Sequence, residues 1–472
     1  MSFLGKQGQK RSAPPAEEPP KPKKKPEPQA VVYKPPPKRR TTPKVAQLRK
    51  QLRPKLLATP DEADTWDSQN PEHQQTIRDR LKMVLQRANI TLTPPELQEL
   101  EQMLMFDLLG FAAIEPMVRD KTYTEIMVNG PEIIFGERKG RLKETEFVFD
   151  DEEHIQWMAQ RIVRPLQRDI SRRNPMVDAR LPDGSRVHLI MPPSALQGTT
   201  VTIRKFPDER LTAPDLISFG SFTEEVSEFL DACVKVKLNV VVSGGTGSGK
   251  TTLLNVLSSF IPEDERIVTI EDSAELNLAQ RHVVGLETCP PLPGTSEGQL
   301  VIRDLVKGSL RMRPDRIVVG ECRSGEALDM LQAMNTGHDG SLTTLHANGP
   351  REAIRRLETM CLMAGVDMPL NVIRNQIATA VHLFVQQSRL QDGSRKITQI
   401  TEVQGMEGES VTMMDLFVYK LPGQTTQGPS HSGGGILEAT GFRPKFYPRF
   451  EEMGIKLSPA VFGTDKMQFS KK

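Results

Sequence analysis

The sequence predicts an α/β protein whose core contains a parallel sheet, and two observations support this prediction. First, the apolar run Val240–Ser243 leads directly into a glycine-rich loop, and a helical pattern follows that loop. Second, strand and helix patterns alternate from Phe222 to about Tyr419, as they do where crossover helices join parallel strands. Upstream of this region we expect a smaller α+β domain, a helical module and a disordered basic arm.

The glycine-rich loop fits the pattern G-x-x-x-x-G-K-[ST], in which backbone N–H groups converge on phosphate oxygens. Lys250 can reach the β- and γ-phosphates, and the Thr251 hydroxyl can hold Mg²⁺ at the positive end of the next helix. A chance glycine-rich turn is rejected, because a strand precedes the loop and a helix follows it. The predicted nucleotide-binding residues here are Gly244, Gly245, Thr246, Gly247, Ser248, Gly249, Lys250, Thr251 and Thr252.

The rest of the parallel sheet is predicted from apolar runs that alternate with helical periodicity. Turn residues at Gln391–Ser394 indicate a closing hairpin, and Met413–Tyr419 reads as the last strand. The expected strands are Val236–Ser243, Arg266–Glu271, Arg316–Gly320, Ser341–His346 and Ala380–Gln386, with helices near Gln299–Leu310, Gly325–Thr336, Pro350–Ala364 and Pro369–Thr379.

Upstream of Phe222, the spacing of apolar residues changes from a helical to a strand pattern along the chain. Residues 64–110 are helical, with Ile77, Leu81 and Leu85 on one face, and residues 111–206 contain short strands around turns. The strands expected there are Glu125–Asn129, Glu132–Gly136, Glu146–Phe149, Met176–Leu181, Ser185–Met191 and Thr199–Lys205, with a helix opened by Asp150. Residues 207–221 read as a linker, 222–420 as the phosphate-loop domain, and 421–472 as a linker and a C-terminal tail that docks on the body or on a neighbour.

The charge is concentrated at the start of the chain. Residues 1–60 hold 16 Lys and Arg against three Glu, together with 13 of the 37 prolines, although the whole chain carries only +2. Such a composition cannot bury enough apolar surface to fold, so residues 1–63 are predicted to be a disordered arm. The arm either attracts an anionic membrane surface or nucleic-acid phosphates, or it is a solubilising tether. No run of eighteen apolar residues and no apolar signal-peptide core indicates export or membrane insertion.

Glu321 is the predicted catalytic residue. It ends the apolar strand Arg316–Gly320, where a carboxylate can orient or deprotonate a water that faces the γ-phosphate. A surface glutamate after a strand is the alternative. Glu271 and Glu275 lie at the end of another strand, where they can face the Mg²⁺ water shell, while Asp272 or the neighbouring serine can instead cap a helix.

His346 is the last candidate, at the far end of the strand that starts at Ser341. A histidine there can donate to a phosphate, but a single histidine is more often a structural residue. The interpretation of His346 depends on the three segments that precede it in the chain, which are the phosphate loop, the acidic segment Glu271–Glu275 and the strand that ends at Glu321.

These four segments, in this order, resemble the ATPases of type II secretion, type IV pili and conjugative type IV secretion. Within that family the chain is most similar to the CpaF/TadA branch, the tight-adherence (Flp) pilus ATPases. That closer resemblance is carried by Met176–Val187, Leu328–Ser341 and Thr398–Gly405, and the family resemblance spans roughly Asp107 to Tyr419. The chain departs from the family pattern at Ser324, where many relatives have glycine, and in the arm before Asp64, which has no recognisable counterpart.

The resemblance implies a RecA-like core, a PAS-like α+β domain, and a hexamer in which ATP lies between these two domains and drives their motion. It implies that Glu321 polarises the water, Glu271 and Glu275 support the metal site, and His346 senses the γ-phosphate. Arg186 and Arg204 match positions that place guanidinium groups near the phosphates in relatives, although each taken singly could be a plain surface arginine.

We therefore expect a cytoplasmic, Mg²⁺-dependent ATPase peripheral to the inner membrane, powering assembly of a tight-adherence pilus or related secretion across the bacterial envelope. Its expected partners are copies of itself, integral inner-membrane platform proteins, and the pilus or secretion apparatus. The alternatives are a conjugation-type secretion ATPase, a nucleic-acid translocase that uses the basic arm, and a protein in which nucleotide is only a structural ligand. Specific nucleic-acid binding is not expected, because the arm lacks interleaved aromatic residues.

Overall fold

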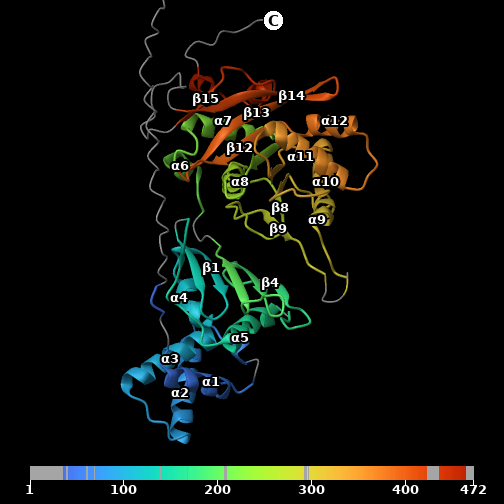
Figure 1. The fold of residues 1–472 in the computed structure, drawn as a ribbon. Coiled ribbons are helices and arrows are strands. Elements are labelled where there is room, and N and C mark those ends of the chain that lie inside the picture. The colour runs from blue at the N-terminus through green and yellow to red at the C-terminus, as the bar shows by residue number, and fades with distance from the viewer. Residues whose placement is uncertain are drawn as a thin grey trace, which may run out of the picture. The chain divides into compact units, whose positions relative to one another are not determined.

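The computed structural model divides the chain into two compact units, residues 1–205 and 206–472, which Figure 1 draws as a ribbon. Each unit is described by itself. The arm before residue 36 and the predicted linker at 422–434 lie outside the described residues. The structure describes residues 36–38, 41–59, 62–68, 70–138, 140–166, 168–206, 210–291, 295, 297–421 and 435–463.

Unit 1 begins with a helical bundle. Thr93 and Glu96 form a capping box at the start of α3, and the Asn70 side chain caps α2, so both helices begin where polar side chains satisfy free backbone N–H groups. Apolar side chains of the three helices share one core. The helices are α1 (Pro43–Leu52), α2 (Pro71–Arg87) and α3 (Pro94–Leu109), with short 3₁₀ helices at Arg53–Leu56 and Glu62–Thr65.

The prediction that residues 1–63 are a disordered arm is wrong for residues 43–56. These residues form α1 and the first 3₁₀ helix, and Val45, Leu52 and Leu56 are fully buried. The high Lys and Pro content of residues 1–63 as a whole concealed this helix. Its apolar side chains nevertheless recur at the spacing of an amphipathic helix. Residues 43–56 therefore do not belong to a disordered arm.

A buried ion network ties α1 to the rest of unit 1. Arg49 donates to both carboxylate oxygens of Asp107 on α3, at 2.8 and 2.5 Å, and His154 Nε2 lies 3.0 Å from Asp107. Burial by itself raises the pKa of Asp107, but the charges of Arg49 and His154 outweigh it and hold that pKa well below its usual range. A buried carboxylate thus keeps its charge because two partners surround it.

The remainder of unit 1 is a six-stranded antiparallel sheet, in the order β3-β2-β1-β6-β5-β4, with α5 (Glu152–Val163) packed in its core. Asp151 caps α5, one residue after the predicted start. The predicted strand Glu146–Phe149 is wrong, because the partner of β2 is Arg141–Glu144, which continues directly from the turn at Gly140. The strands are β1 (Tyr123–Asn129), β2 (Ile134–Arg138), β3 (Arg141–Glu144), β4 (Met176–Arg180), β5 (Arg186–Ile190) and β6 (Thr200–Arg204), and α4 (Glu115–Arg119) precedes them.

Unit 2 contains a nine-stranded sheet in the order β15-β14-β13-β12-β7-β11-β10-β8-β9. The six strands from β12 to β9 are parallel, and β13 to β15 continue the sheet in antiparallel fashion. The parallel strands are β7 (Val240–Gly244), β8 (Ile267–Glu271), β9 (Val283–Glu287), β10 (Arg316–Val319), β11 (Leu342–Leu345) and β12 (Leu383–Arg389).

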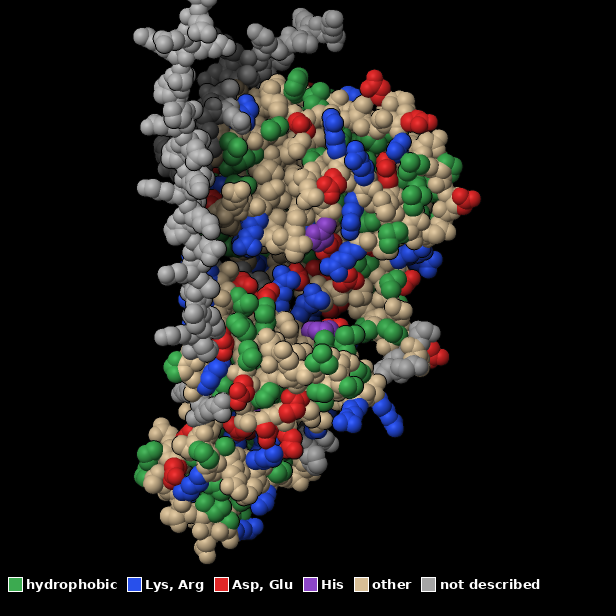
Figure 2. Space-filling view, in the orientation of Figure 1, with side chains coloured by type: hydrophobic (Ala, Val, Ile, Leu, Met, Phe, Trp, Pro, Cys, Tyr) green, Lys and Arg blue, Asp and Glu red, His purple; other side chains and the backbone are tan. Residues whose placement is uncertain are grey.

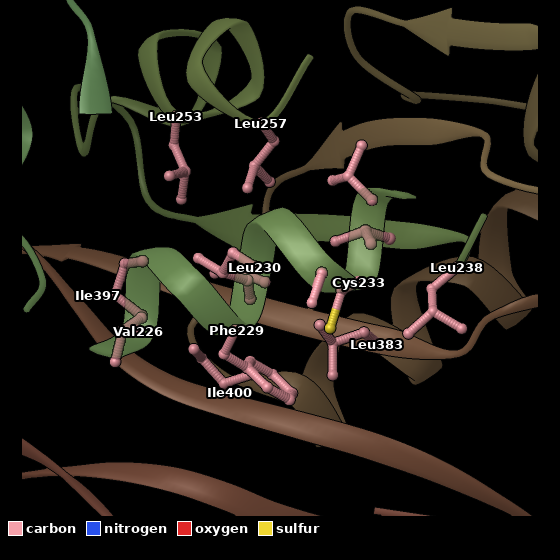
Figure 3. Packing of buried hydrophobic residues seen from close by; sticks show 14 of the residues in the cluster. Val226, Phe229, Leu230, Cys233, Leu238, Leu253, Leu257, Leu383, Ile397 and Ile400 are labelled. Carbon is pink, nitrogen blue, oxygen red and sulfur yellow. The ribbon is translucent and has the colours of Figure 1, made fainter. Parts of the chain in front are cut away.

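Helices cover both faces of this sheet (Figure 1). On β7, Val240 and Val242 belong to one hydrophobic cluster and Val241 to the other, so the strand is buried on both sides. Figure 3 shows the side chains of α7 among Leu383, Ile397 and Ile400 in the first cluster. The helices are α6 (Ala213–Ser218), α7 (Glu224–Lys235), α8 (Lys250–Ser258), α9 (Ile302–Ser309), α10 (Glu326–Asn335), α11 (Pro350–Met363) and α12 (Leu370–Ala380). Helix α6 lies within the predicted linker 207–221, where a Thr212–Asp215 capping box starts it.

Residues 435–463 pack against the rest of unit 2. After β13 (Arg395–Glu407) and β14 (Ser410–Lys420), β15 (Ile436–Ala439) adds to the sheet, and α13 (Tyr447–Glu452) follows with a 3₁₀ helix at Pro459–Phe462. Phe450 and Phe462 pack edge-on against Phe229 of α7, with ring centroids 6.3 and 6.1 Å from it. The tail is therefore part of the core of unit 2. Among the described residues, no helix combines the length and the apolar character needed to cross a membrane.

We predict that Phe450→Ala lowers the free energy of unfolding of unit 2 by about 3–5 kcal/mol, because it leaves a cavity among aromatic rings. Phe450 is fully buried, whereas Phe442 in the same tail is 55% exposed. Phe442→Ala is the matched control and should change stability by less than about 0.5 kcal/mol. Denaturant unfolding measures both, and equal effects of the two substitutions would contradict the docking of the tail.

Candidate functional site: the phosphate loop of unit 2

The glycine-rich loop joins β7 to α8 at the carboxyl end of the parallel strands. Gly247 and Gly249 have φ angles of 69° and 93°, in the left-handed region that favours glycine. Gly244 has no room for a side chain, because a Cβ atom there would lie 2.4 Å from the carbonyl oxygen of Gln387 on β12. The loop conformation thus depends on these glycines and on the neighbouring strand.

Lys250, the first residue of α8, is buried within the loop. Its Nζ donates to the carbonyl oxygen of Gly245 at 3.1 Å and lies 3.3 Å from Nδ1 of His346. Burial lowers the pKa of Lys250, and the nearby Glu321 carboxylate opposes that effect. Among the described residues, no carboxylate forms an ion pair with the Lys250 ammonium group, whose contacts are Gly245 and His346.

Glu321 follows β10 by two residues and points toward the same edge of the sheet. Its Oε2 accepts a hydrogen bond from Arg323 at 3.0 Å, and its Oε1 lies 2.9 Å from Nε2 of His346. That contact is close but not aligned as a hydrogen bond, so Oε1 is a buried oxygen without a hydrogen-bond partner among the described residues. An unsatisfied carboxylate oxygen beside a phosphate loop is positioned to accept a proton from a water.

His346 lies between the two charged groups, one residue after β11. Burial lowers its pKa, and the charge of Lys250 lowers it further. A neutral ring that accepts from the Lys250 ammonium at Nδ1 must carry its proton on Nε2, the nitrogen that faces Glu321. The sheet therefore brings together Lys250, His346 and Glu321 from three strand ends that are far apart in the sequence.

The acidic segment after β8 forms a turn around its own carboxylate. Glu271 Oε1 accepts from the backbone N–H groups of Glu275 and Leu276, both at 2.9 Å. Burial raises the pKa of Glu271 to about 7, while these hydrogen bonds oppose the rise. Asp272 instead faces Arg323, whose Nη1 is 3.3 Å from its carboxylate. Glu271 thus closes this turn through two backbone hydrogen bonds, and its support of a metal site stays a prediction.

Two residues at the site escaped the sequence analysis. Arg323 bridges Glu321 and Asp272, and the hydrogen bond to Glu321 raises its pKa. Gln387 is buried beside the first glycine of the loop, at a β-bulge between β12 and β13. Bulges redirect side chains, but no sequence pattern predicts the bulge at Gln387. For Arg323, the only signal in the sequence is its position two residues after Glu321.

Arg186 and Arg204 lie in unit 1, at directly opposite positions of β5 and β6, and both are exposed. Arg204 Nε is 3.8 Å from a carboxylate oxygen of Glu125. Their link to the phosphate loop stays a prediction.

Hard oxygen donors are present for a magnesium ion. Thr251 is the second residue of α8, and its hydroxyl forms no hydrogen bond with a described residue. The carboxylate of Glu321 is a second oxygen-bearing group at this edge, and its Oε1 has no hydrogen-bond partner among the described residues. Mg²⁺ prefers oxygen ligands and usually keeps several waters and substrate phosphates, so it needs few ligands from the protein. The described residues contain no cluster of three or more His, Cys, Asp or Glu.

The strand order completes the assignment of the protein class. The loop strand β7 and the glutamate strand β10 are separated by one strand, β11, which carries His346 at its end. A parallel sheet with this order, a phosphate loop after the first strand and helices on both faces is a RecA-like core of a P-loop nucleotide-binding protein.

Comparisons with known proteins agree with this class. Residues 107–413 match the family model described as Type II/IV secretion system protein, and the chain belongs to that family. An uncharacterised protein of Methanocaldococcus jannaschii is 42% identical over 274 residues, which cover 56% of this chain and 37% of that protein. The chain thus spans about a third of the length of that relative.

Shorter relatives are covered more fully. The type IV secretion system protein VirB11 of Bartonella quintana is 30% identical over 326 residues, covering 61% of this chain and 90% of that protein. The solved VirB11 ATPase from the Brucella suis type IV secretion system is 31% identical over 61% of this chain and 91% of its own, with a TM-score of 0.34. The matches show the family, and the CpaF/TadA branch stays a prediction.

We predict that the stability of unit 2 falls as the pH rises from 4.5 to 7, and that Glu271→Gln abolishes most of this dependence. The folded protein keeps a proton on Glu271 that the unfolded chain releases above its ordinary pKa of 4.5. The difference of pKa values corresponds to roughly 3 kcal/mol, so the variant should be the more stable protein at pH 8 and equal to wild type near pH 4.

Denaturant unfolding between pH 4 and 8 measures this difference. Glu263→Gln, which removes an exposed acid after α8, is the control and should keep the wild-type slope. Parallel slopes for wild type and Glu271→Gln would show that Glu271 is ionised in the folded state.

Proposed function

We propose that this protein is a Mg²⁺-dependent ATPase that powers assembly of a tight-adherence pilus or related secretion across the bacterial envelope. The observation that carries the proposal is the convergence of Lys250, His346 and Glu321 at the end of three parallel strands. Family membership supports a secretion protein, and the phosphate loop supports nucleotide as its fuel.

In the proposed reaction, Glu321 orients a water and receives its proton at Oε1, which has no aligned partner in this structure. Lys250 exchanges the carbonyl of Gly245 for phosphate oxygens. His346 senses the γ-phosphate by turning its Nε2–H from Glu321 to a hydrogen bond with a phosphate oxygen. Glu271 holds the acidic turn, and Glu271 and Glu275 would support the metal site from this turn. The hydroxyl of Thr251 would hold Mg²⁺, which supplies charge neutralisation of the β- and γ-phosphates.

The two units provide the parts for mechanical work. We infer that ATP binds between them and that Arg186 and Arg204 of unit 1 approach the phosphates, so that hydrolysis moves one unit against the other. A homo-oligomer, expected to be a hexamer, would contain one such nucleotide site per copy of the chain. The support for these statements is the similarity of the chain to secretion ATPases, and the test is a structure with a bound ATP analogue.

The tight-adherence pilus is the finer part of the proposal and depends on the segments Met176–Val187 and Leu328–Ser341. A conjugation-type secretion ATPase is the second candidate, because a relative named conjugal transfer protein TrbB, from Rhizobium radiobacter, is 34% identical over 248 residues. Those residues cover 52% of this chain and 72% of that relative. The expected partners are integral inner-membrane platform proteins, with the chain in the cytoplasm and peripheral to that membrane.

A nucleic-acid translocase is less well supported. On the face shown in Figure 2, the described Lys and Arg side chains are interspersed with Asp and Glu. Non-specific binding of nucleic acid depends on concentrated positive charge along the phosphate backbone. Turnover stimulated by DNA in a salt-sensitive manner would favour that function over the secretion motor.

We predict that Glu321→Gln lowers the kcat for ATP hydrolysis by roughly 10²–10⁴-fold, because the water loses its proton acceptor. The same variant should retain ATP binding, whereas Lys250→Ala should lose both binding and turnover. Phosphate release and binding of a fluorescent ATP analogue measure the two effects, with Glu263→Gln as the control. Unchanged turnover in Glu321→Gln would overturn the assignment of Glu321.

We further predict that Arg323→Ala lowers kcat roughly tenfold with little change in KM, because Arg323 holds the Glu321 carboxylate in place and does not bind the phosphates. Arg323→Lys should recover part of the rate, since a positive charge remains near Glu321 and Asp272. Steady-state kinetics measure both variants. An increase of KM without a change of kcat would instead place Arg323 in ATP binding.

A further inference from the structure

Two arginines of the β12–β13 hairpin lie beside the phosphate loop. Arg395 Nε donates a hydrogen bond to the carbonyl oxygen of Gly247 at 3.0 Å. A Cβ atom built on Gly247 would lie 3.9 Å from Nη1 of Arg389, and one built on Gly249 would lie 3.0 Å from Cδ of Arg395. Both arginines are exposed. The hairpin therefore forms a positively charged wall along the loop.

The two arginines also oppose each other. The register of β12 and β13 pairs Arg389 directly with Arg395. Like charges at directly opposite positions destabilise an antiparallel pair. Neither guanidinium forms an ion pair with a carboxylate in the described part of the chain, and Asp392 in the intervening turn accepts hydrogen bonds from Ser394 instead. An anion that contacts both groups would remove this repulsion.

The same wall contains an unsatisfied buried group. Gln387, two residues before Arg389, is 2% exposed, and its amide nitrogen would lie 3.3 Å from a Cβ atom on Gly249. Its Oε1 has no hydrogen-bond partner among the described residues. Buried polar atoms are rarely left without a partner. Where this wall meets the loop, one buried side-chain oxygen, Oε1 of Gln387, thus has no hydrogen-bond donor among the described residues.

We propose that Arg389 and Arg395 form a second anion-binding element of the nucleotide site, which contacts the phosphate chain of a nucleoside di- or triphosphate from the hairpin side. This inference rests on the proposed function, since it requires nucleotide at the phosphate loop. Arg395 uses only Nε in its bond to Gly247, so both of its Nη groups remain for phosphate oxygens. Arg389 keeps its whole guanidinium for the ligand.

The test compares Arg389→Gln and Arg395→Gln in the full chain with Lys396→Gln. Lys396 is on the same hairpin but donates to the carbonyl of Gly220, away from the loop, so it is the matched control. Titration with fluorescent ATP and ADP should show roughly tenfold weaker binding for each arginine variant, the loss expected for one charge-assisted hydrogen bond. Competition by adenosine, which has no phosphate, should be the same for all proteins.

Thermal unfolding without nucleotide separates ligand binding from a purely structural role. Arg389→Gln removes one of two opposed like charges, so its Tm should equal or exceed that of wild type while its ATP affinity falls. A lower Tm together with weaker adenosine competition would show that Arg389 only supports the fold and would overturn the proposal. Arg395→Lys, which keeps the charge, should bind ATP more tightly than Arg395→Gln.

The outcome also distinguishes this inference from the proposed function. If wild type binds ATP, Lys250→Ala does not, and both arginine variants bind as wild type does, the inference fails alone. If wild type itself binds no ATP or ADP, the proposed function fails and the inference fails with it.

Discussion

The alternation of charge from Lys250 through His346 to Glu321 and Arg323 is the constraint on which the site depends. A neutral imidazole separates the ammonium group from the carboxylate, at 3.3 Å on one side and 2.9 Å on the other. If Lys250 and Glu321 paired directly, neither would be available to phosphate or water. The arrangement keeps one cation and one base close together without neutralising them, which is what hydrolysis of a phosphate anhydride requires.

The sheet makes this separation possible. Strand β11 lies between the loop strand β7 and the glutamate strand β10, so the residue after β11 must lie between Lys250 and Glu321. Both faces of these strands are buried by helices, which fixes their register. The docked aromatic tail stabilises the helix α7 side of the same core.

The sequence predicted the strand ends that carry the candidate site residues, because each of these residues lies within one local pattern. The loop residues, Glu321 and His346 lie at one edge of the sheet, because parallel strands deliver their carboxyl ends together. The sequence predicted fewer of the helices and strands whose formation depends on tertiary packing. Helix α1 lies in the segment predicted to be a disordered arm, and the sequence pattern does not predict β9 or β15, because such short elements depend on contacts made by distant residues.

The sequence by itself determined the phosphate loop, the acidic and histidine segments that follow it and the α/β class, since each is recognised from residue types at short spacing along the chain. Only the tertiary structure decided the surroundings of the loop. Gln387 and Arg395 contact it from more than a hundred residues away, and Arg323 acquires its bridge to Asp272 from the neighbouring strand. Such contacts follow from strand order and register, which no local pattern encodes.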